Sequence, residues 1–342
     1  MSEKPPRRPR YSGRNPRTFA EKYKEHDPTR YTADVEKVLA TGKTPAGTHR
    51  PIMVREILEV LAVPPGATVV DCTLGYGGHA TALLQAVQPG GRVIALDIDP
   101  LELPRTEARL RALGFPAESL LVQRMNFAGL APLLATAAPG GVAAILADLG
   151  VSSMQLDNPA RGFTFKAEGP LDLRMNPERG QPASAWLGKV NATQLERTLR
   201  ENSDEPHAAL LAPALLRAPL PTTTALAAVV RQTLGPGDAI EDSVRRVFQA
   251  LRIAVNDEFG ALDAFLRTLP QCLQPGGRVA ILTFHSGEDR RVKQAFRAGQ
   301  RDGLYAGIAP DPQRPSAAEV RANPRSSSAK LRWAIRAPGE VG

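Results

Sequence analysis

The stretch VVDCTLGYGGH (residues 69–79), followed by RVIALDID (residues 92–99), decides the fold. A β-branched run that stops at clustered glycines is typical of a buried strand that ends in a tight turn. Residues 80–87 then carry the apolar content of a helix, and Pro89-Gly90-Gly91 ends it. The second stretch reads as another buried strand with an acid at its tip. Together they predict a βαβ unit whose glycine turn lies where open α/β sheets usually bind ligands.

Two ligands fit such a turn. Gly75, Gly77 and Ala80 match the loose dinucleotide pattern G-x-G-x-x-G/A, with Asp97 roughly 20 residues further on. Asp71 favours the other ligand, because an acid inside an apolar strand is costly unless a cationic or hydrogen-bonding group meets it. The cationic methionine part of S-adenosylmethionine (SAM) supplies that group, and a dinucleotide pyrophosphate does not. We therefore expect a SAM site in which Asp97 binds the ribose hydroxyls; a structural turn without a ligand is the alternative.

Composition narrows the class of protein. The chain has 342 residues, of which 42% are hydrophobic, so it can form two domains or one domain with a large insertion. No apolar run is long enough to span a membrane. Cys72 and Cys272 suggest neither a disulfide framework nor a zinc site, and they suit a reducing cytoplasm. The net charge of +8 suits a polyanionic partner, although basic surfaces also serve solubility.

The first 46 residues form a basic, proline-rich segment with little to bury. Such a composition predicts a disordered arm that either lies along phosphates or is a solvated tail. Its cations include Lys4, Arg7, Arg8, Arg10, Arg14 and Arg17.

The rest of the chain predicts an α/β sheet interrupted by helices. Asp97, Phe127 and Asp148 end or follow three expected strands, so they should line one edge of a parallel sheet. A long polar loop from residue 149 to residue 175 then departs from this rhythm, and long ordered loops are usually functional. Further strands are expected at 120–123, 142–148, 278–284 and 331–335. Helices are expected at 54–61, 102–113, 186–199, 208–216 and 224–233, with one helical repeat over 251–266 and a flexible stretch after 300.

We therefore expect three parts. The arm covers residues 1–46, the sheet domain covers 47–155 and 246–342, and an all-helical insertion covers 156–245. No internal repeat, P-loop, G-x-S-x-G pattern or cluster with metal-ligand spacing is present in the sequence. We expect no bound metal.

Several separate stretches resemble one family, the ribosomal RNA small-subunit methyltransferase H (MraW) family. They run in the family's order from about residue 48 to residue 336. They are HRP (49–51), DCTLGYGGH (71–79), DLGVSSMQLD (148–157), RGF (161–163), GPLDLRM (169–175), FQALRIAVN (248–256), FHS (284–286) and NPR (323–325). The chain departs from the usual pattern at Gly287, where the family has Leu, at residues 202–205 and at Ser327.

The resemblance implies a class I SAM-dependent methyltransferase, with a Rossmann-like sheet and a helical insertion. The family methylates N4 of a cytidine in the decoding region of small-subunit (16S) rRNA, so the implied partners are this rRNA or the ribosomal subunit. The sequence leaves open whether the chain is a monomer or a homodimer. Cofactor contacts carry over to Gly77, Gly78, His79, Asp97, Phe127, Asp148 and Gln155, beside Asp71 and Gly75 from the glycine turn.

The reaction needs an acceptor for the target amine, because the lone pair of cytosine N4 is delocalised into the ring. Asp148 is placed for that role or for the amino group of the cofactor. Ser152, Ser153 and His285 are further candidates, and a strand-end histidine bonded to backbone is the alternative for His285. Phosphate contacts are expected from Arg161, Arg174, Arg252, Arg290 and Arg325, with ion-paired or solvated faces as the alternative.

Two other functions remain open from the sequence. A SAM enzyme could act on DNA, another RNA or a small molecule, although the segment DLGV (148–151) lacks the Asp/Ser-Pro-Pro-aromatic motif of DNA amino-methyltransferases. A non-catalytic ribosome-assembly factor could also keep the fold. The intact Asp71, Gly77, Asp97 and Asp148 argue against that reading.

Overall fold

The computed structural model describes residues 51–217, 219–237 and 239–339. The expected arm at 1–46 and the residues His49 and Arg50 lie outside the described residues. Within the described ranges, no helix has the length and apolar character needed to cross a membrane. No group of three or more His, Cys, Asp or Glu residues in these ranges is placed to hold a metal ion.

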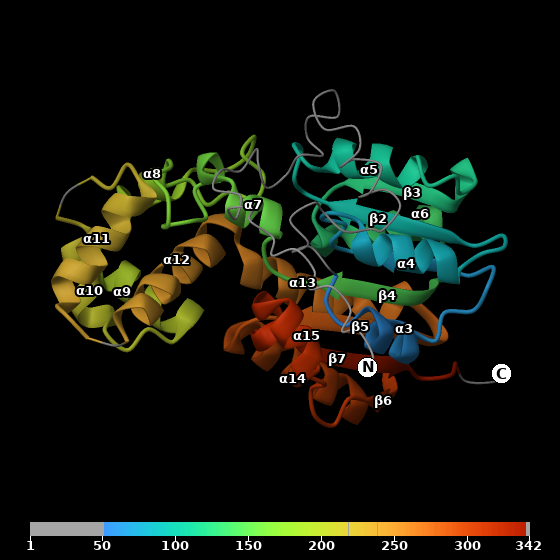
Figure 1. Ribbon diagram of the computed structural model, residues 1–342. Helices are drawn as coiled ribbons and strands as arrows, with labels where there is room; N and C mark the ends of the chain where they lie inside the picture. The colour runs from blue at the N-terminus through green and yellow to red at the C-terminus, as the bar shows by residue number, and fades with distance from the viewer. Residues whose placement is uncertain (1–50, 218, 238, 340–342) are drawn as a thin grey trace, which may run out of the picture. The chain divides into compact units, whose positions relative to one another are not determined.

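A seven-stranded sheet with the order β3-β2-β1-β4-β5-β7-β6 forms the centre of the described part (Figure 1). Strands β3, β2, β1, β4 and β5 are parallel, whereas β7 pairs antiparallel with both β5 and β6. The order of the strands switches between β1 and β4: β2 and β3 lie on one side of β1, and β4 and β5 lie on the other. Open α/β sheets bind ligands at the carboxyl ends of the strands at such a switch point. The strands are β1 (Thr68–Asp71), β2 (Arg92–Asp97), β3 (Leu120–Arg124), β4 (Val142–Asp148), β5 (Leu273–Thr283), β6 (Tyr305–Ile308) and β7 (Lys330–Arg336).

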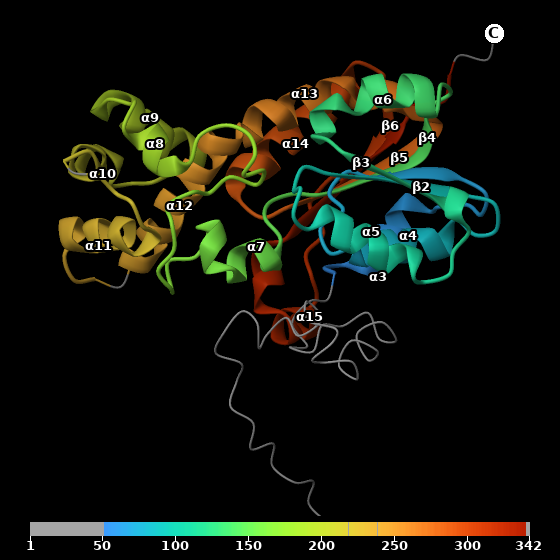
Figure 2. The ribbon, with the colours of Figure 1, turned by 90° about the horizontal axis from the view of Figure 1, so that it is seen from above.

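Helices cover both faces of the sheet, because successive strand side chains alternate between two apolar clusters. Val70 and Ile94 join the cluster under α6, α13 and α14, while their neighbours Val69 and Val93 join the cluster under α3, α4 and α5. Figure 2 shows these two helical layers on either side of the strands. The helices are α3 (Val54–Leu61), α4 (Gly78–Ala86), α5 (Leu103–Arg111), α6 (Leu130–Ala137), α13 (Glu258–Cys272) and α14 (Ser286–Arg301).

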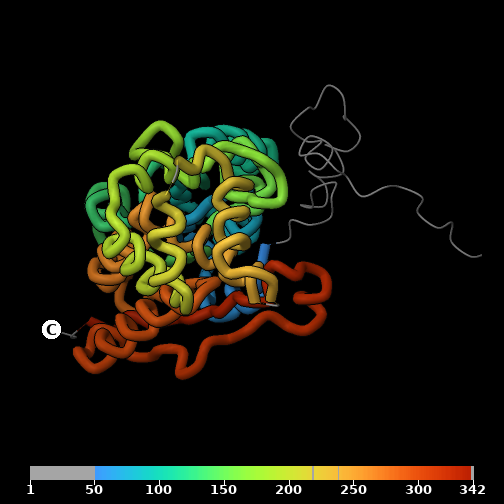
Figure 3. The backbone as a smooth tube through the Cα atoms, turned by 90° about the vertical axis from the view of Figure 1, so that its left-hand side faces the viewer, coloured from blue at the N-terminus to red at the C-terminus, as the bar shows by residue number. Residues whose placement is uncertain are grey.

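The segment between β4 and α13 contributes no strand to the sheet; a long loop is followed by helices that pack around an apolar core of their own. Figure 3 shows the backbone of this segment facing the viewer. After β4 come the short helix α7 (Ser153–Asp157) and the 3-10 turn η4 (Pro159–Arg161). The remaining helices are α8 (Ala183–Leu187), α9 (Ala192–Ser203), α10 (Ala208–Leu215), α11 (Thr223–Leu234) and α12 (Ile240–Asn256). The expected domain limit at 245/246 falls inside α12, whose Val244, Val247 and Leu251 pack in the helical core.

Three expectations about elements were wrong. The helix expected at 186–199 is two helices, because Asn191 starts a new one with a capping box that involves Gln194. The repeat over 251–266 is interrupted at Asp257, which adopts φ 50° between α12 and α13. The stretch after 300, expected to be flexible, contains β6 and the helix α15 (Ala317–Ala322).

Candidate functional site

The glycine turn follows β1 and leads into α4. Gly77 is the N-cap of α4 at φ 80°, a conformation that favours glycine, and a Cβ there would lie 3.0 Å from the side chain of Thr106. Helix α5 holds the turn from outside. The hydroxyl of Thr106 donates to the carbonyl of Gly75 at 2.7 Å, and Arg109 donates to the carbonyl of Tyr76 at 2.5 Å. Helix α5 therefore fixes the shape of the turn.

Asp71 lies at the carboxyl end of β1 and is only 1% exposed. Its Oδ1 accepts a hydrogen bond from the backbone N–H of Thr73 at 3.0 Å. Its Oδ2 is buried and has no hydrogen-bond partner among the described residues. Burial raises the pKa of this carboxyl group to about 6, against the effects of His79 and the Thr73 N–H. A buried carboxylate with an unpartnered oxygen is the feature that we predicted from the sequence to meet a cationic ligand.

His79 and Asp148 face each other across the same edge. The Nε2 atom of His79 lies 3.4 Å from Oδ2 of Asp148, which is ion-pair distance without an aligned hydrogen bond. Burial lowers the pKa of His79, but Asp148, Asp71 and Glu319 raise it more, so the pKa lies above its ordinary value. Oδ1 of Asp148 is also buried and unpartnered among the described residues. The hydroxyl of Thr73 accepts the N–H of Asp148 at 2.7 Å and so fixes the two strand ends together.

Asp97 ends β2 and supports the glycine turn. Its Oδ2 accepts the N–H of Gly75 at 2.7 Å, and its Oδ1 accepts the N–H of Asp99 at 2.9 Å. Burial raises the pKa of Asp97, while these backbone N–H groups lower it by less. The carboxylate lies beside the turn, where the sequence predicted a ribose contact.

Asp99 is the residue that the sequence analysis missed. It is 2% exposed, and its Oδ2 accepts hydrogen bonds from Gln155 Nε2 at 2.8 Å and from Arg161 Nη1 at 2.7 Å. Gln155 is held a second time, because it forms a capping box with Ser152 at the start of α7. The signal in the sequence was a second acid two residues beyond Asp97 at the same strand tip.

Ser152 and His285 occupy helix-capping positions. Oγ of Ser152 accepts the N–H of Gln155 at 3.2 Å, and Nδ1 of His285 accepts the N–H of Glu288 at 3.4 Å. Nε2 of His285 lies 3.2 Å from the Glu288 carboxylate, so both ring nitrogens face Glu288. Burial raises the pKa of Glu288, but His285 and Arg252 lower it more. The Nδ1 contact fits the structural alternative for His285, but its Nε2 is buried without a hydrogen-bond partner among the described residues, as are atoms of Asp71 and Asp148.

Phe127 lies in the 3-10 turn η3 (Phe127–Gly129), just after β3. Its ring packs edge-on against Phe265 of α13, with 5.3 Å between ring centroids. It is partly buried beside the core cluster of that face of the sheet.

The five arginines expected at phosphates fall into two groups. Arg161 is 7% exposed and pairs with Asp99, and the half-buried Arg252 forms a two-pronged ion pair with Glu258. Arg174 makes a similar pair with Asp172. By contrast, the side chains of Arg290 and Arg325 are 52% and 43% exposed, so these two keep charge at the surface beside their pairs with Asp204 and Asp157.

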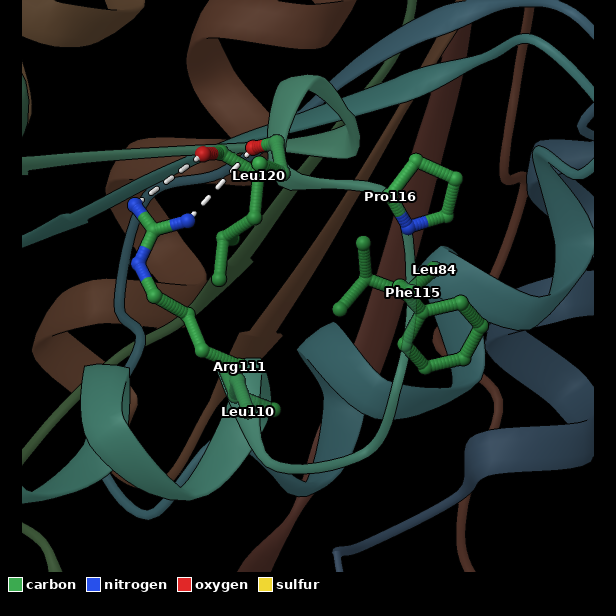
Figure 4. A pocket seen from close by; sticks show the side chains of 7 residues that line it. Leu84, Leu110, Arg111, Phe115, Pro116 and Leu120 are labelled. Carbon is green, nitrogen blue, oxygen red and sulfur yellow. Dashed lines mark hydrogen bonds between the residues drawn. The ribbon is translucent and has the colours of Figure 1, made fainter.

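A small apolar hollow of about 120 Å³ lies elsewhere, where α4 and α5 approach the start of β3 (Figure 4). Leu84, Leu110, Phe115 and Leu120 line it, and Arg111 reaches across to the carbonyls of Ala117 and Leu120. It lies at the opposite end of the parallel strands from Asp71 and Asp148. Its lining includes one basic residue, Arg111, and no acidic residue. The chemistry of the hollow does not suit a cationic cofactor.

The strand-tip residues fit SAM. Asp71 and Asp148 each keep a buried, unpartnered carboxylate oxygen at the carboxyl edge of the sheet. A buried polar group that lacks a partner costs free energy in the protein alone and becomes satisfied when a ligand hydrogen-bonds to it.

Comparison with known proteins agrees with this geometry. Residues 46–337 match the model of the MraW methylase family. The chain is 49% identical to ribosomal RNA small subunit methyltransferase H 2 of Alkaliphilus metalliredigens, over 98% of this chain and 99% of that protein. It is 47% identical to ribosomal RNA small subunit methyltransferase H 1 of Lachnoclostridium phytofermentans, over 97% of this chain and 93% of that protein. The chain belongs to the MraW methylase family.

Proposed function

We propose that this protein transfers a methyl group from SAM to N4 of a cytidine in the decoding region of small-subunit rRNA. The observation that carries the proposal is the near-full-length likeness to proteins named ribosomal RNA small subunit methyltransferase H. The unpartnered acid oxygens at the strand tips independently support the SAM part of the proposal, because they suit a cationic cofactor. The expected partner is the small-subunit rRNA or the subunit that contains it.

The cofactor site would be formed by Asp71, Asp97 and the glycine turn, with His79, Phe127 and Gln155 around it. When bound, SAM supplies an activated methyl group on a sulfonium. Asp71 would offer its free Oδ2 to the cationic part, and Asp97 its remaining lone pairs to the ribose. Gly77 and Gly78 would let the backbone approach the ligand closely.

Asp148 is the residue that we assign to the target amine. Its buried Oδ1 is free to accept an N–H of the amine, which holds the nitrogen in place and favours the pyramidal form whose lone pair can react. Nε2 of His79 lies 3.4 Å from Oδ2, so a protonated imidazole would attract the carboxylate without a hydrogen bond between them. After transfer, the same carboxylate can accept the proton that the methylated nitrogen loses.

The test is the pattern of modified nucleosides in rRNA. A strain that lacks the gene should lose N4-methylcytidine from its small-subunit rRNA, and the purified protein with SAM should restore it in isolated subunits. A protein that binds SAM but methylates DNA or another RNA in preference would overturn the assignment of substrate. A protein that binds no SAM, measured by calorimetry, would instead indicate an assembly factor without catalysis.

A further inference from the structure

Asp99 joins the cofactor edge to the loop that opens the helical insertion. Its N–H donates to Asp97, the expected ribose contact, while its own Oδ2 accepts from Gln155 and Arg161. One carboxylate thus connects the tip of β2 with both α7 and η4. With Asp99 and Arg161 at 2% and 7% exposure, the ion pair is shielded from solvent and weakly screened.

Arg161 extends the connection further along the loop. Its Nη2 atom donates to the carbonyls of Met175 at 2.8 Å and Arg174 at 3.3 Å. The N–H of Met175 in turn donates to Asn256 at the end of α12, at 2.8 Å. Asn256 also donates to the carbonyl of Leu173, which adopts φ 64°. A continuous set of hydrogen bonds therefore leads from the β2 tip to the last turn of α12.

The two sides of this loop are anchored differently. Val151 and Leu156 pack on the core of the helical insertion, and Phe163, Leu171 and Leu173 belong to it. On the sheet side, the loop is held by polar contacts: Gln155 and Arg161 bind Asp99, and Asp157 pairs with Arg325. Polar contacts of this kind can be exchanged for water at small net cost, whereas the apolar anchor cannot. The loop can thus leave the sheet edge while it stays folded on the insertion.

We propose that the Asp99–Arg161 ion pair couples the cofactor site to this loop, so that SAM binding docks residues 152–176 and prepares the surface that receives RNA. The inference rests on the proposed function and on Gln155 as a cofactor contact. A cofactor that touches Asp97 and Gln155 binds the docked loop more tightly than the undocked one, and therefore shifts the population toward it. Linkage then requires RNA and cofactor to tighten each other's binding by the same factor.

Trypsin cleavage of the wild-type protein tests the docking step without RNA. Arg161 and Arg174 are trypsin cleavage sites inside the loop, and their side chains are largely shielded in the docked form, at 7% and 18% exposure. S-adenosylhomocysteine, which carries no methyl group to transfer, should slow cleavage at both by about tenfold, the middle of the usual range for coupled sites. Unchanged cleavage with the ligand bound would overturn the proposal, whatever the protein methylates.

A double variant tests whether the ion pair carries the effect. Asp99→Asn with Arg161→Met removes both charges together, so that neither is left buried and unpaired. In the wild type, S-adenosylhomocysteine should tighten binding of isolated small ribosomal subunits about tenfold, and in the double variant by less than about twofold. Equal tightening in both proteins would overturn the role of the pair. Arg161→Lys should retain part of the effect, because it keeps the charge and loses the bonds to Met175 and Arg174.

The matched control is Arg124→Ala. Arg124 of β3 pairs with Glu178 just beyond the same loop, but both side chains are more than half exposed. Exposed pairs contribute little, so this variant should keep the full tightening and the full protection from trypsin. Loss of the effect in the control as well would assign the coupling to the loop as a whole and contradict the assignment to Asp99 and Arg161.

Discussion

Charged groups are hydrogen-bonded differently in two regions of the molecule: the carboxyl edge of the sheet and the loop that opens the insertion. At the edge, Asp71 and His79 are buried and Asp148 is partly exposed, and each keeps one buried atom without a hydrogen-bond partner among the described residues. In the loop, Asp172 and Arg174 form a two-pronged pair, and Arg161 makes bonds to Asp99 and two carbonyls.

This difference indicates that the sheet edge binds a ligand, whereas the charged residues of the loop have a structural role. Satisfied polar networks fix a conformation, whereas unsatisfied buried groups destabilise the protein until a ligand binds to them. Burial raises the pKa of both Asp71 and Asp97 at the edge, and perturbed carboxyl groups of this kind are typical of functional sites. The loop residues that look cationic in sequence instead hold the backbone in place.

The largest effect is expected at Asp148. Asp148→Asn removes the anionic acceptor that we assign to the target amine, so the rate of methylation should fall by roughly 100-fold or more. The melting temperature should stay close to that of the wild type, because the Thr73 contact is to the backbone N–H. Asp263→Asn, which alters an exposed acid on α13, is the control. A rate within threefold of the wild type, on the order of 0.7 kcal/mol, would remove Asp148 from the chemistry.

Asp97 should matter for cofactor affinity rather than for rate. Asp97→Ala loses a hydrogen bond from the ribose to a charged group and should weaken SAM binding by roughly 1.5–3 kcal/mol, measured by calorimetry. Because Asp97 also holds the N–H groups of Gly75 and Asp99, Asp97→Asn is the milder companion variant. Unchanged affinity in folded Asp97→Ala would refute the assignment.

Asp71 should show opposite effects on stability and binding. Its pKa is raised to about 6 in the folded protein, so folding at neutral pH must keep a buried charge that the unfolded chain solvates freely. Asp71→Asn should therefore stabilise the protein without ligand by about 1–2 kcal/mol at pH 8, after allowance for an unsatisfied amide, and weaken SAM binding.

The pH dependence of the melting temperature tests the predicted stabilisation by Asp71→Asn. The difference in melting temperature between Asp71→Asn and the wild type should grow as pH rises from about 4 to about 6 and then level off. That window lies between the ordinary pKa of an aspartate and the raised value in the folded protein. A destabilised variant at pH 8 would show that Asp71 is satisfied in the protein alone.

Arg174 should have a small effect, on stability. The sequence favoured a phosphate contact, but its pairing with Asp172 favours a structural strut. Arg174→Ala should lower the free energy of unfolding by about 1 kcal/mol and leave RNA affinity nearly unchanged. In contrast, Arg325→Ala should reduce the slope of RNA affinity against salt by about one. A large loss of RNA affinity in Arg174→Ala at an unchanged melting temperature would instead support the phosphate contact predicted from the sequence.

The sequence predicted the sheet well because buried parallel strands read as apolar runs that end at glycines or acids. The tips at Asp71, Asp97 and Asp148 followed from that pattern alone. Pairing of charges was not predictable, since Asp99 and Arg161 are 62 residues apart along the chain and meet only through the fold. The reason for Gly287 was not predictable either, because it also depends on a contact made by the fold. The family usually has Leu at this position, and in the structure a Cβ there would lie 2.5 Å from the ring of Phe259.

Hydrogen exchange with and without SAM tests the central claim, that the unpartnered acids at the sheet edge form the cofactor site, most directly. We predict that SAM slows exchange in residues 71–79, 97–101 and 148–157, and leaves the hollow lined by Leu84, Leu110 and Phe115 unchanged. Slower exchange around that hollow, with residues 71–79 and 148–157 unaffected, would contradict the account.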